Sequence, residues 1–127
     1  LKQSLYNQVK FKLVEGDNIY YHVTTKENAQ KIIESGELRN GKWESYVFAW
    51  KKQPTEKQAS IAGISSKATT VIKFKTNASF QPDEGNRMKP EIKDVVVQTT
   101  TGQILPITIT DVEIVGFKKE WWQFWKK

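Results

Sequence analysis

The sequence of 127 residues contains no cysteine and a single histidine, His22. Without cysteine the fold cannot depend on disulfides, and thiolate zinc sites and cysteine nucleophiles are excluded. One histidine also cannot supply the converging ligands that catalytic zinc sites use. We therefore predict no metal site, and His22 is the first candidate for any chemistry.

Long apolar runs and glycine-rich motifs are missing as well. No window approaches the roughly 18 consecutive apolar residues that a membrane-spanning helix needs, and no signal peptide is recognisable. None of the seven glycines falls into a P-loop or a dinucleotide-binding fingerprint. Classical kinases, P-loop enzymes and Rossmann dehydrogenases are therefore excluded, and no membrane span is expected.

Acidic residues are outnumbered, because 20 lysines and arginines face 14 aspartates and glutamates, for a net charge of +6. A surface of this kind attracts polyanions such as RNA, or an acidic protein, over long range. The alternative is that lysines spread round the surface serve only solubility.

The first clear structural pattern is a strand followed by a capped helix. Ile19–Val23 is a run of β-branched and aromatic residues that predicts a strand, with His22 near its end. Thr24 and Glu27 have the spacing of a capping box, so a helix is expected directly afterwards. Gly36 stands where a helix commonly ends in a left-handed conformation.

Further strands and one more helix follow. Tyr46–Trp50 predicts a second strand, and Thr55 begins a second capping pattern before a short helix. Residues 77–90 are predicted to form a long loop, and residues 1–15 an N-terminal helix. Other β-branched runs predict strands at Thr70–Lys75, Asp94–Thr99, Ile104–Thr110 and Val112–Phe117. We therefore predict a single α+β domain over residues 1–127, with N-terminal helices packed on a curved, mostly antiparallel sheet of five to six strands.

Two kinds of chemistry are compatible with one histidine. A metal-independent ribonuclease needs a group that takes the 2′-hydroxyl proton and cations that stabilise the phosphorane. His22, nearby lysines and Thr24 or Thr25 could provide these groups. ADP-ribosyl transfer instead needs a carboxylate to balance an oxocarbenium-like transition state, and there the histidine would act as a hydrogen-bond donor.

Three stretches resemble the ADP-ribosyltransferase superfamily, in the branch with a His-Tyr-Glu signature. They are Tyr20-Tyr21-His22-Val23-Thr24, the segment 28–38 and Tyr46-Val47-Phe48-Ala49-Trp50. The resemblance implies that His22 and Thr24 bind the adenosine ribose of NAD, which is then a substrate. It also implies that Tyr46 or Trp50 stacks on nicotinamide, and it places the third motif near Gln98.

The sequence thus gives eight candidate site residues. The catalytic candidates are His22, Thr24, Tyr46 and Gln98, and the substrate-binding candidates are Thr25, Trp50, Arg39 and Lys73.

Short basic domains of this kind also resemble the C-terminal toxins that bacteria deliver to competitors. That resemblance implies a cognate immunity protein, delivery from the producer cell, action in the target-cell cytoplasm on a protein or RNA, and possible need of a host protein factor.

Two alternatives to the transferase remain open. The first is a metal-independent ribonuclease toxin that cleaves tRNA with His22 as general acid and base, without a cofactor. The second is a non-enzymatic module that docks a protein through the aromatic tail of Trp121, Trp122 and Trp125. In that case His22 would be a structural histidine, and the aromatic residues of the second strand would belong to the core.

Overall fold

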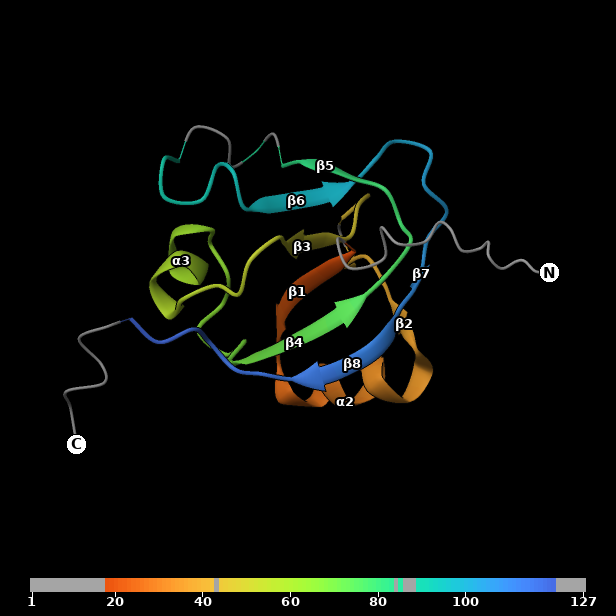
Figure 1. Ribbon diagram of the computed structural model, residues 1–127, viewed down its shortest axis with the longest axis horizontal. Helices are drawn as coiled ribbons and strands as arrows, with labels where there is room; N and C mark the ends of the chain where they lie inside the picture. Colours follow the sequence, from red (N-terminus) through yellow and green to blue (C-terminus); the bar gives the residue numbers. More distant parts are fainter. Residues whose placement is uncertain (1–17, 43, 84, 86–88, 121–127) are drawn as a thin grey trace, which may run out of the picture.

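The computed structural model describes residues 18–42, 44–83, 85 and 89–120 (Figure 1). The predicted N-terminal helix at residues 1–15 and the tryptophans of the tail lie outside the described residues.

A six-stranded sheet forms the centre of the fold, in the order β5-β6-β3-β1-β4-β8 (Figure 1). Its strands are β1 (Ile19–Thr24), β3 (Phe48–Trp50), β4 (Thr70–Lys75), β5 (Phe80–Pro82), β6 (Val96–Thr99) and β8 (Thr110–Ile114). A second sheet pairs β2 (Glu37–Leu38) with β7 (Ile107–Thr108). All these pairings are antiparallel, so the predicted α+β fold with a mostly antiparallel sheet is confirmed.

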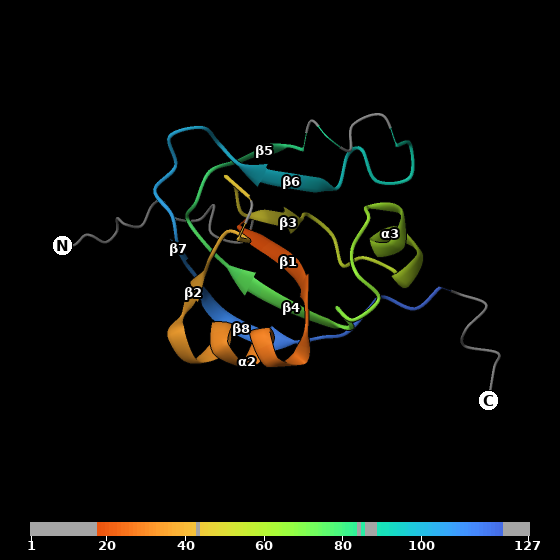
Figure 2. The same ribbon diagram turned by 180° about the vertical axis from the view of Figure 1, so that it is seen from behind.

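Alternate residues of β1 enter two different hydrophobic clusters, because successive side chains of a strand point to opposite faces. Tyr20 packs on the cluster that holds Ala29 of helix α2 (Lys26–Ser35). Tyr21 and Val23 belong to the cluster on which residues of helix α3 (Glu56–Ile61) pack. Figure 2 shows the two helices at different parts of the sheet, with α2 beside β8. Both faces of β1 are therefore covered.

The largest fully buried side chains of the described residues lie in β4 and β2. Phe74 and Ile72 of β4 are fully buried, as is Leu38 of β2. Burying a side chain of this size contributes about 1.5–3 kcal/mol each. The strand that carries His22 is hydrogen-bonded to β4 along its whole length, from Ile19 to Thr24, and this register holds the histidine in place.

Helix α2 begins one residue later than the capping pattern predicts. Thr24 is still part of β1 and pairs with Thr70, so its backbone is extended and its side chain is buried. Thr25 is the N-cap, and its hydroxyl accepts a hydrogen bond of 3.1 Å from the backbone N–H of Asn28. The end of the helix agrees with the prediction, because Gly36 has a φ of 72°.

The later strands differ from their predicted ranges. Of the predicted strand Ile104–Thr110 only β7 and Thr110, the first residue of β8, are in strands, and Pro106 has no backbone N–H with which to pair. The chain then enters the main sheet again as β8, which begins two residues before the predicted Val112. Strand β5 lies inside the predicted loop 77–90, which was therefore only partly correct.

Candidate active site

The one histidine lines a cavity of about 530 Å³ that is bounded by the end of β1, one side of α2, β2 and the residues that lead into β3. Ligand-binding pockets commonly have volumes of about 300–1,000 Å³, so the cavity is large enough for a nucleotide. The residues that line it are His22, Thr24, Asn28, Lys31, Ile32, Ser35, Glu37, Leu38, Arg39, Asn40, Gly41, Glu44, Tyr46, Val47 and Phe48.

The imidazole of His22 is oriented by a backbone carbonyl. Its Nδ1 lies 2.9 Å from the carbonyl oxygen of Phe48. Because a carbonyl oxygen can only accept, Nδ1 must carry the proton in this hydrogen bond. In the neutral ring Nε2 then holds a lone pair, and Nε2 has no hydrogen-bond partner among the described residues. A hydroxyl group of a ligand could donate to it.

Burial lowers the pKa of His22 below its ordinary value of 6.5, and the hydrogen bond to the Phe48 carbonyl acts in the opposite direction. Burial has the larger effect because the charged imidazolium loses its hydration. The ring is therefore neutral near pH 7, with Nε2 unprotonated. A neutral imidazole of this tautomer can accept a hydrogen bond or remove a proton.

Thr24 lies on the same side of β1 as His22, because the two residues are two positions apart in one strand. Its side chain is buried and lines the same cavity. The wall opposite is formed by α2, where Asn28, Lys31 and Ser35 follow each other at intervals of three and four residues. A single helix face thus supplies an amide, an ammonium and a hydroxyl group.

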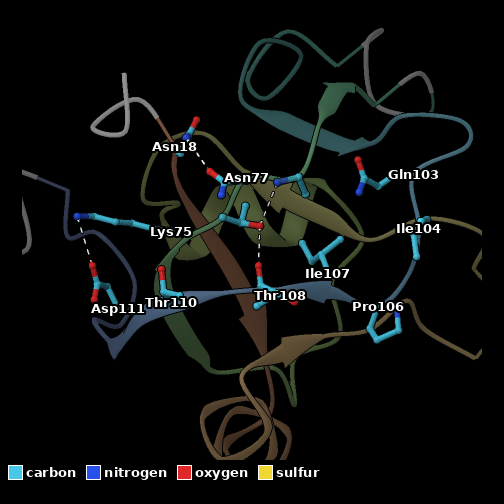
Figure 3. Close-up of a pocket in the computed structure, with 12 residues that line it drawn as sticks. Asn18, Lys75, Asn77, Gln103, Ile104, Pro106, Ile107, Thr108, Thr110 and Asp111 are labelled. Atoms are coloured by element: carbon cyan, nitrogen blue, oxygen red, sulfur yellow. Dashed lines mark hydrogen bonds and ion pairs between the residues drawn. The ribbon is translucent and has the colours of Figure 1, made fainter. Parts of the chain in front are cut away.

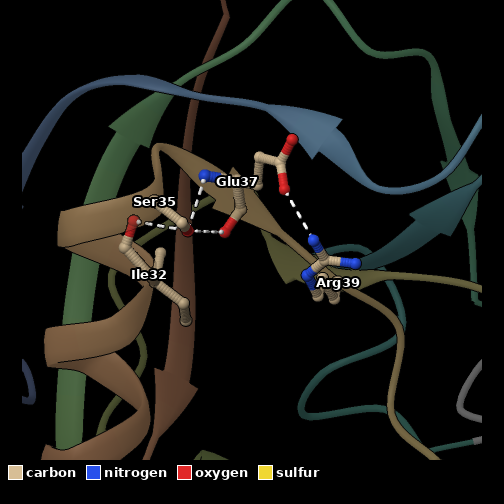
Figure 4. Close-up of polar contacts among 4 residues, drawn as sticks. All are labelled: Ile32, Ser35, Glu37 and Arg39. Carbon is tan, nitrogen blue, oxygen red and sulfur yellow. Dashed lines mark hydrogen bonds and ion pairs between the residues drawn. The ribbon is translucent and has the colours of Figure 1, made fainter.

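A short chain of polar contacts follows the end of α2 (Figure 4). The hydroxyl of Ser35 lies 3.4 Å from the carbonyl oxygens of Ile32 and of Glu37, and it accepts a hydrogen bond of 3.2 Å from the backbone N–H of Glu37. The Glu37 carboxylate in turn accepts a hydrogen bond of 2.9 Å from the guanidinium group of Arg39. The cavity therefore contains a carboxylate and a cation that contact each other.

A second carboxylate comes from the connection to β3. The backbone around Glu44 is held by Asn40, whose side-chain amide donates to the Glu44 carbonyl over 2.7 Å. Tyr46 follows, and its ring packs edge-on against that of Phe48 with 6.4 Å between the ring centres. Glu44 and Tyr46 both line the cavity.

The structure brings together four of the predicted site residues and leaves the other four outside this cavity. His22, Thr24, Tyr46 and Arg39 line it, whereas Gln98, Thr25, Trp50 and Lys73 do not.

The four residues outside the cavity have other surroundings. Trp50 is buried in the cluster with Val23. Gln98 is buried in β6 between β3 and β5, and Thr25 caps α2. The ammonium of Lys73 lies 3.9 Å from the carboxylate of Glu113.

Several residues that line the cavity were not predicted as site residues from the sequence. The spacing of Asn28, Lys31 and Ser35 on a predicted helix could have indicated a polar face beside the strand of His22. Glu37 and Glu44 have no comparable signal, because they come to the cavity through the pairing of β2 with β7 and through the loop before β3.

Another cavity, of about 610 Å³, lies at the far ends of β4 and β7 (Figure 3). It contains an ion pair of 3.3 Å between Lys75 and Asp111 and a contact of 3.4 Å between the side chains of Asn18 and Asn77. Its charged side chains pair with each other, whereas the other cavity holds His22, whose pKa burial lowers. The cavity at His22 is therefore the better candidate for a reaction site.

The described part of the chain contains no group of three or more histidine, aspartate or glutamate side chains that could hold a metal ion. Neither of its helices has the length and apolarity to cross a bilayer. Comparisons with protein-family models, curated proteins and solved structures found no match.

Proposed function

We propose that the protein is an ADP-ribosyltransferase that transfers ADP-ribose from NAD to a protein or RNA target, with the cavity at His22 as its active site. The observation that carries the proposal is the imidazole of His22, whose Nδ1 contacts the Phe48 carbonyl and whose Nε2 has no hydrogen-bond partner among the described residues, while carboxylates and cations line the same cavity. NAD offers ribose hydroxyls to the lone pair, a diphosphate to the cations and a developing positive charge to a carboxylate.

Each group has a role in this proposal. Nε2 of His22 accepts a hydrogen bond from a ribose hydroxyl, which differs from the donor role expected from the sequence. Lys31 and Arg39 bind the diphosphate, and the ring of Tyr46 stacks on nicotinamide. A carboxylate of Glu37 or Glu44 stabilises the oxocarbenium-like transition state, in place of the position near Gln98.

The proposed transfer needs no reactant other than NAD and the acceptor. The bond between C1′ of the ribose and the nicotinamide nitrogen breaks, and its electron pair leaves with neutral nicotinamide. The lone pair of the acceptor's oxygen or nitrogen forms the new bond to C1′. The acceptor's proton passes to a carboxylate and then to solvent, so the products are the ribosylated acceptor, nicotinamide and one proton.

A second candidate function is a metal-independent ribonuclease acting on tRNA. It is favoured by the lowered pKa of His22, which leaves the ring unprotonated and able to remove a 2′-hydroxyl proton near pH 7. Lys31 and Arg39 would then stabilise the phosphorane. The net charge of +6 supports tRNA as the substrate of the ribonuclease and, for the transferase, RNA as the acceptor.

The proposed setting is that of a bacterial toxin, delivered from a producer cell into the cytoplasm of a competitor and neutralised there by a cognate immunity protein. This setting rests on the resemblance of the sequence. It is tested by expressing the chain inside a bacterial cell, where we expect growth arrest that His22→Ala abolishes. Normal growth with the unaltered protein, at proven expression, would argue against a toxin.

The two enzymatic functions are separated with purified protein. One reaction contains labelled NAD with a cell extract as acceptor, and the other contains total tRNA with EDTA. Label that becomes attached to a protein or RNA supports the transferase, whereas discrete tRNA fragments support the ribonuclease. His22→Ala should lower the yield of tRNA fragments by about 10²-fold or more, or the yield of labelled product by about tenfold, and Lys75→Ala, in the other cavity, should change neither.

A further inference from the structure

The ion pair between Arg39 and Glu37 lies in the wall of the proposed active site and involves two groups that the proposed reaction would use separately. We propose that the diphosphate of the bound substrate takes over Arg39 and thereby releases the Glu37 carboxylate for the reaction at the ribose. This inference rests on the proposed function, because it assigns a substrate-dependent change to that same site.

The contact between Arg39 and Glu37 is weak enough for a bound anion to replace Glu37 as the partner of Arg39. The contact of 2.9 Å joins one guanidinium nitrogen to one carboxylate oxygen, and the exposed fractions of the two side chains are 69% and 38%. Exposed ion pairs of this kind contribute little to stability, because water and salt screen the two charges. A guanidinium group has five N–H donors in a planar fork, so most of its donors remain available for a phosphate.

The backbone beneath the pair is fixed by contrast. Glu37 pairs with Thr108, and the buried Leu38 pairs with Ile107. The hydroxyl of Ser35 additionally accepts from the backbone N–H of Glu37 (Figure 4). An exchange of partners therefore requires only rotation of the two long side chains, with no movement of β2.

Charge decides the direction of the exchange. A diphosphate carries two negative charges and several acceptor oxygens, and it can bind the guanidinium fork through two parallel hydrogen bonds. Glu37 offers one charge through one oxygen. The substrate therefore displaces Glu37, and the released carboxylate is left beside the new anion in a cavity that also holds His22. In the free protein the same carboxylate is occupied by Arg39.

The exchange predicts a specific pattern in the binding of ADP, which carries the diphosphate but cannot react. Arg39→Ala weakens ADP binding by about 10- to 100-fold, and Arg39→Lys by less, because lysine retains the charge without the fork. Glu37→Gln tightens ADP binding by up to about fivefold, since Arg39 no longer has to leave a partner. In the Arg39→Ala background Glu37→Gln tightens ADP binding by less, because only the repulsion between the carboxylate and the diphosphate is then removed.

The effect of Glu37→Gln with and without Arg39 distinguishes two roles of Glu37: exchange of Arg39 with the diphosphate, and simple repulsion of the diphosphate. If Glu37 only repels the diphosphate, its replacement tightens ADP binding equally with and without Arg39, and the exchange is overturned. The matched control is Lys75→Ala, which removes one cation from an exposed ion pair of 3.3 Å in the other cavity and should leave ADP binding unchanged. An equal loss for Lys75→Ala and Arg39→Ala would also overturn the proposal.

Kinetics with NAD give an independent readout. Arg39→Ala should raise KM for NAD about tenfold or more while kcat stays within about twofold, because Glu37 is already free in that variant. Glu37→Gln should lower kcat by at least about tenfold, and a retained kcat would overturn its release as a catalytic group. Arg39-dependent ADP binding without any turnover of NAD would refute the proposed transferase alone. An unchanged KM for NAD in Arg39→Ala, with turnover retained, would refute the exchange alone.

Discussion

The two ring nitrogens of His22 can be tested separately, because the structure gives them different partners. Nδ1 donates to the Phe48 carbonyl over 2.9 Å, and Nε2, which has no partner in the part of the chain that the structure describes, can accept from a ligand. Asparagine retains a donor near the position of Nδ1 and has no atom at Nε2. Glutamine retains an acceptor near the position of Nε2 and loses the donor to Phe48, and neither amide can act as a base.

The stability of these variants checks the tautomer. His22→Gln leaves the part-buried Phe48 carbonyl without its donor, and loss of this hydrogen bond should lower the free energy of unfolding by about 0.5–1.5 kcal/mol. His22→Asn should cost less, because it can keep that hydrogen bond. The measurement is urea-induced unfolding of both variants beside the unaltered protein. A larger loss for His22→Asn than for His22→Gln would refute the assignment of the proton to Nδ1.

The activity of the same variants distinguishes the two reactions. If Nε2 only accepts a ribose hydroxyl, as in the transferase, His22→Gln should retain most of kcat/KM. His22→Asn should then lose a factor of up to about ten, because one neutral hydrogen bond contributes about 0.5–1.5 kcal/mol. If Nε2 removes a proton, both variants should lose about 10²- to 10⁴-fold in kcat. Full activity of both variants on NAD and on tRNA would exclude His22 from the site.

Three further predictions follow from the described structure. Because the pKa of His22 is lowered by burial, the unfolded chain binds its proton at a higher pH than the folded protein does. The free energy of unfolding should therefore fall as the pH drops from about 6.5 toward the lower folded pKa, by up to about 1.4 kcal/mol per pH unit, and His22→Gln should remove this slope in urea titrations. Gly36→Ala should lower the free energy of unfolding by about 1–2 kcal/mol, because a φ of 72° is strained for alanine although the added Cβ would meet no atom closer than 4.0 Å. A change in thermal unfolding below the measurement error would contradict the left-handed helix end. Thr25→Ala should cost about 0.5–2 kcal/mol through loss of the helix cap, whereas Thr24→Ser should leave the cap intact, and equal helix stability of the two variants by circular dichroism would contradict the assignment of the N-cap.

Local patterns of the sequence predicted the elements around the site. The β-branched and aromatic run that begins at Ile19 forms β1, and the helix after it ends at Gly36 in the expected left-handed conformation. The N-cap was misplaced by one residue, because both Thr24 and Thr25 can cap a helix and only the pairing of Thr24 with Thr70 decides between them. Strand β5 was missed because its three residues, Phe80–Pro82, carry too little pattern to stand out from a loop.

The composition was sufficient to exclude cysteine chemistry and to select His22 as the candidate reactive residue. The local order of the residues was sufficient to place this histidine in a strand before a capped helix. These properties depend on neighbouring residues or on simple absence. The tautomer of His22 depends instead on a carbonyl 26 residues away, and the carboxylate of Glu37 reaches the cavity only because β2 pairs with β7, some 70 residues further along the chain. Antiparallel pairing between distant segments sets these distances, and a sequence read in order carries no measure of them.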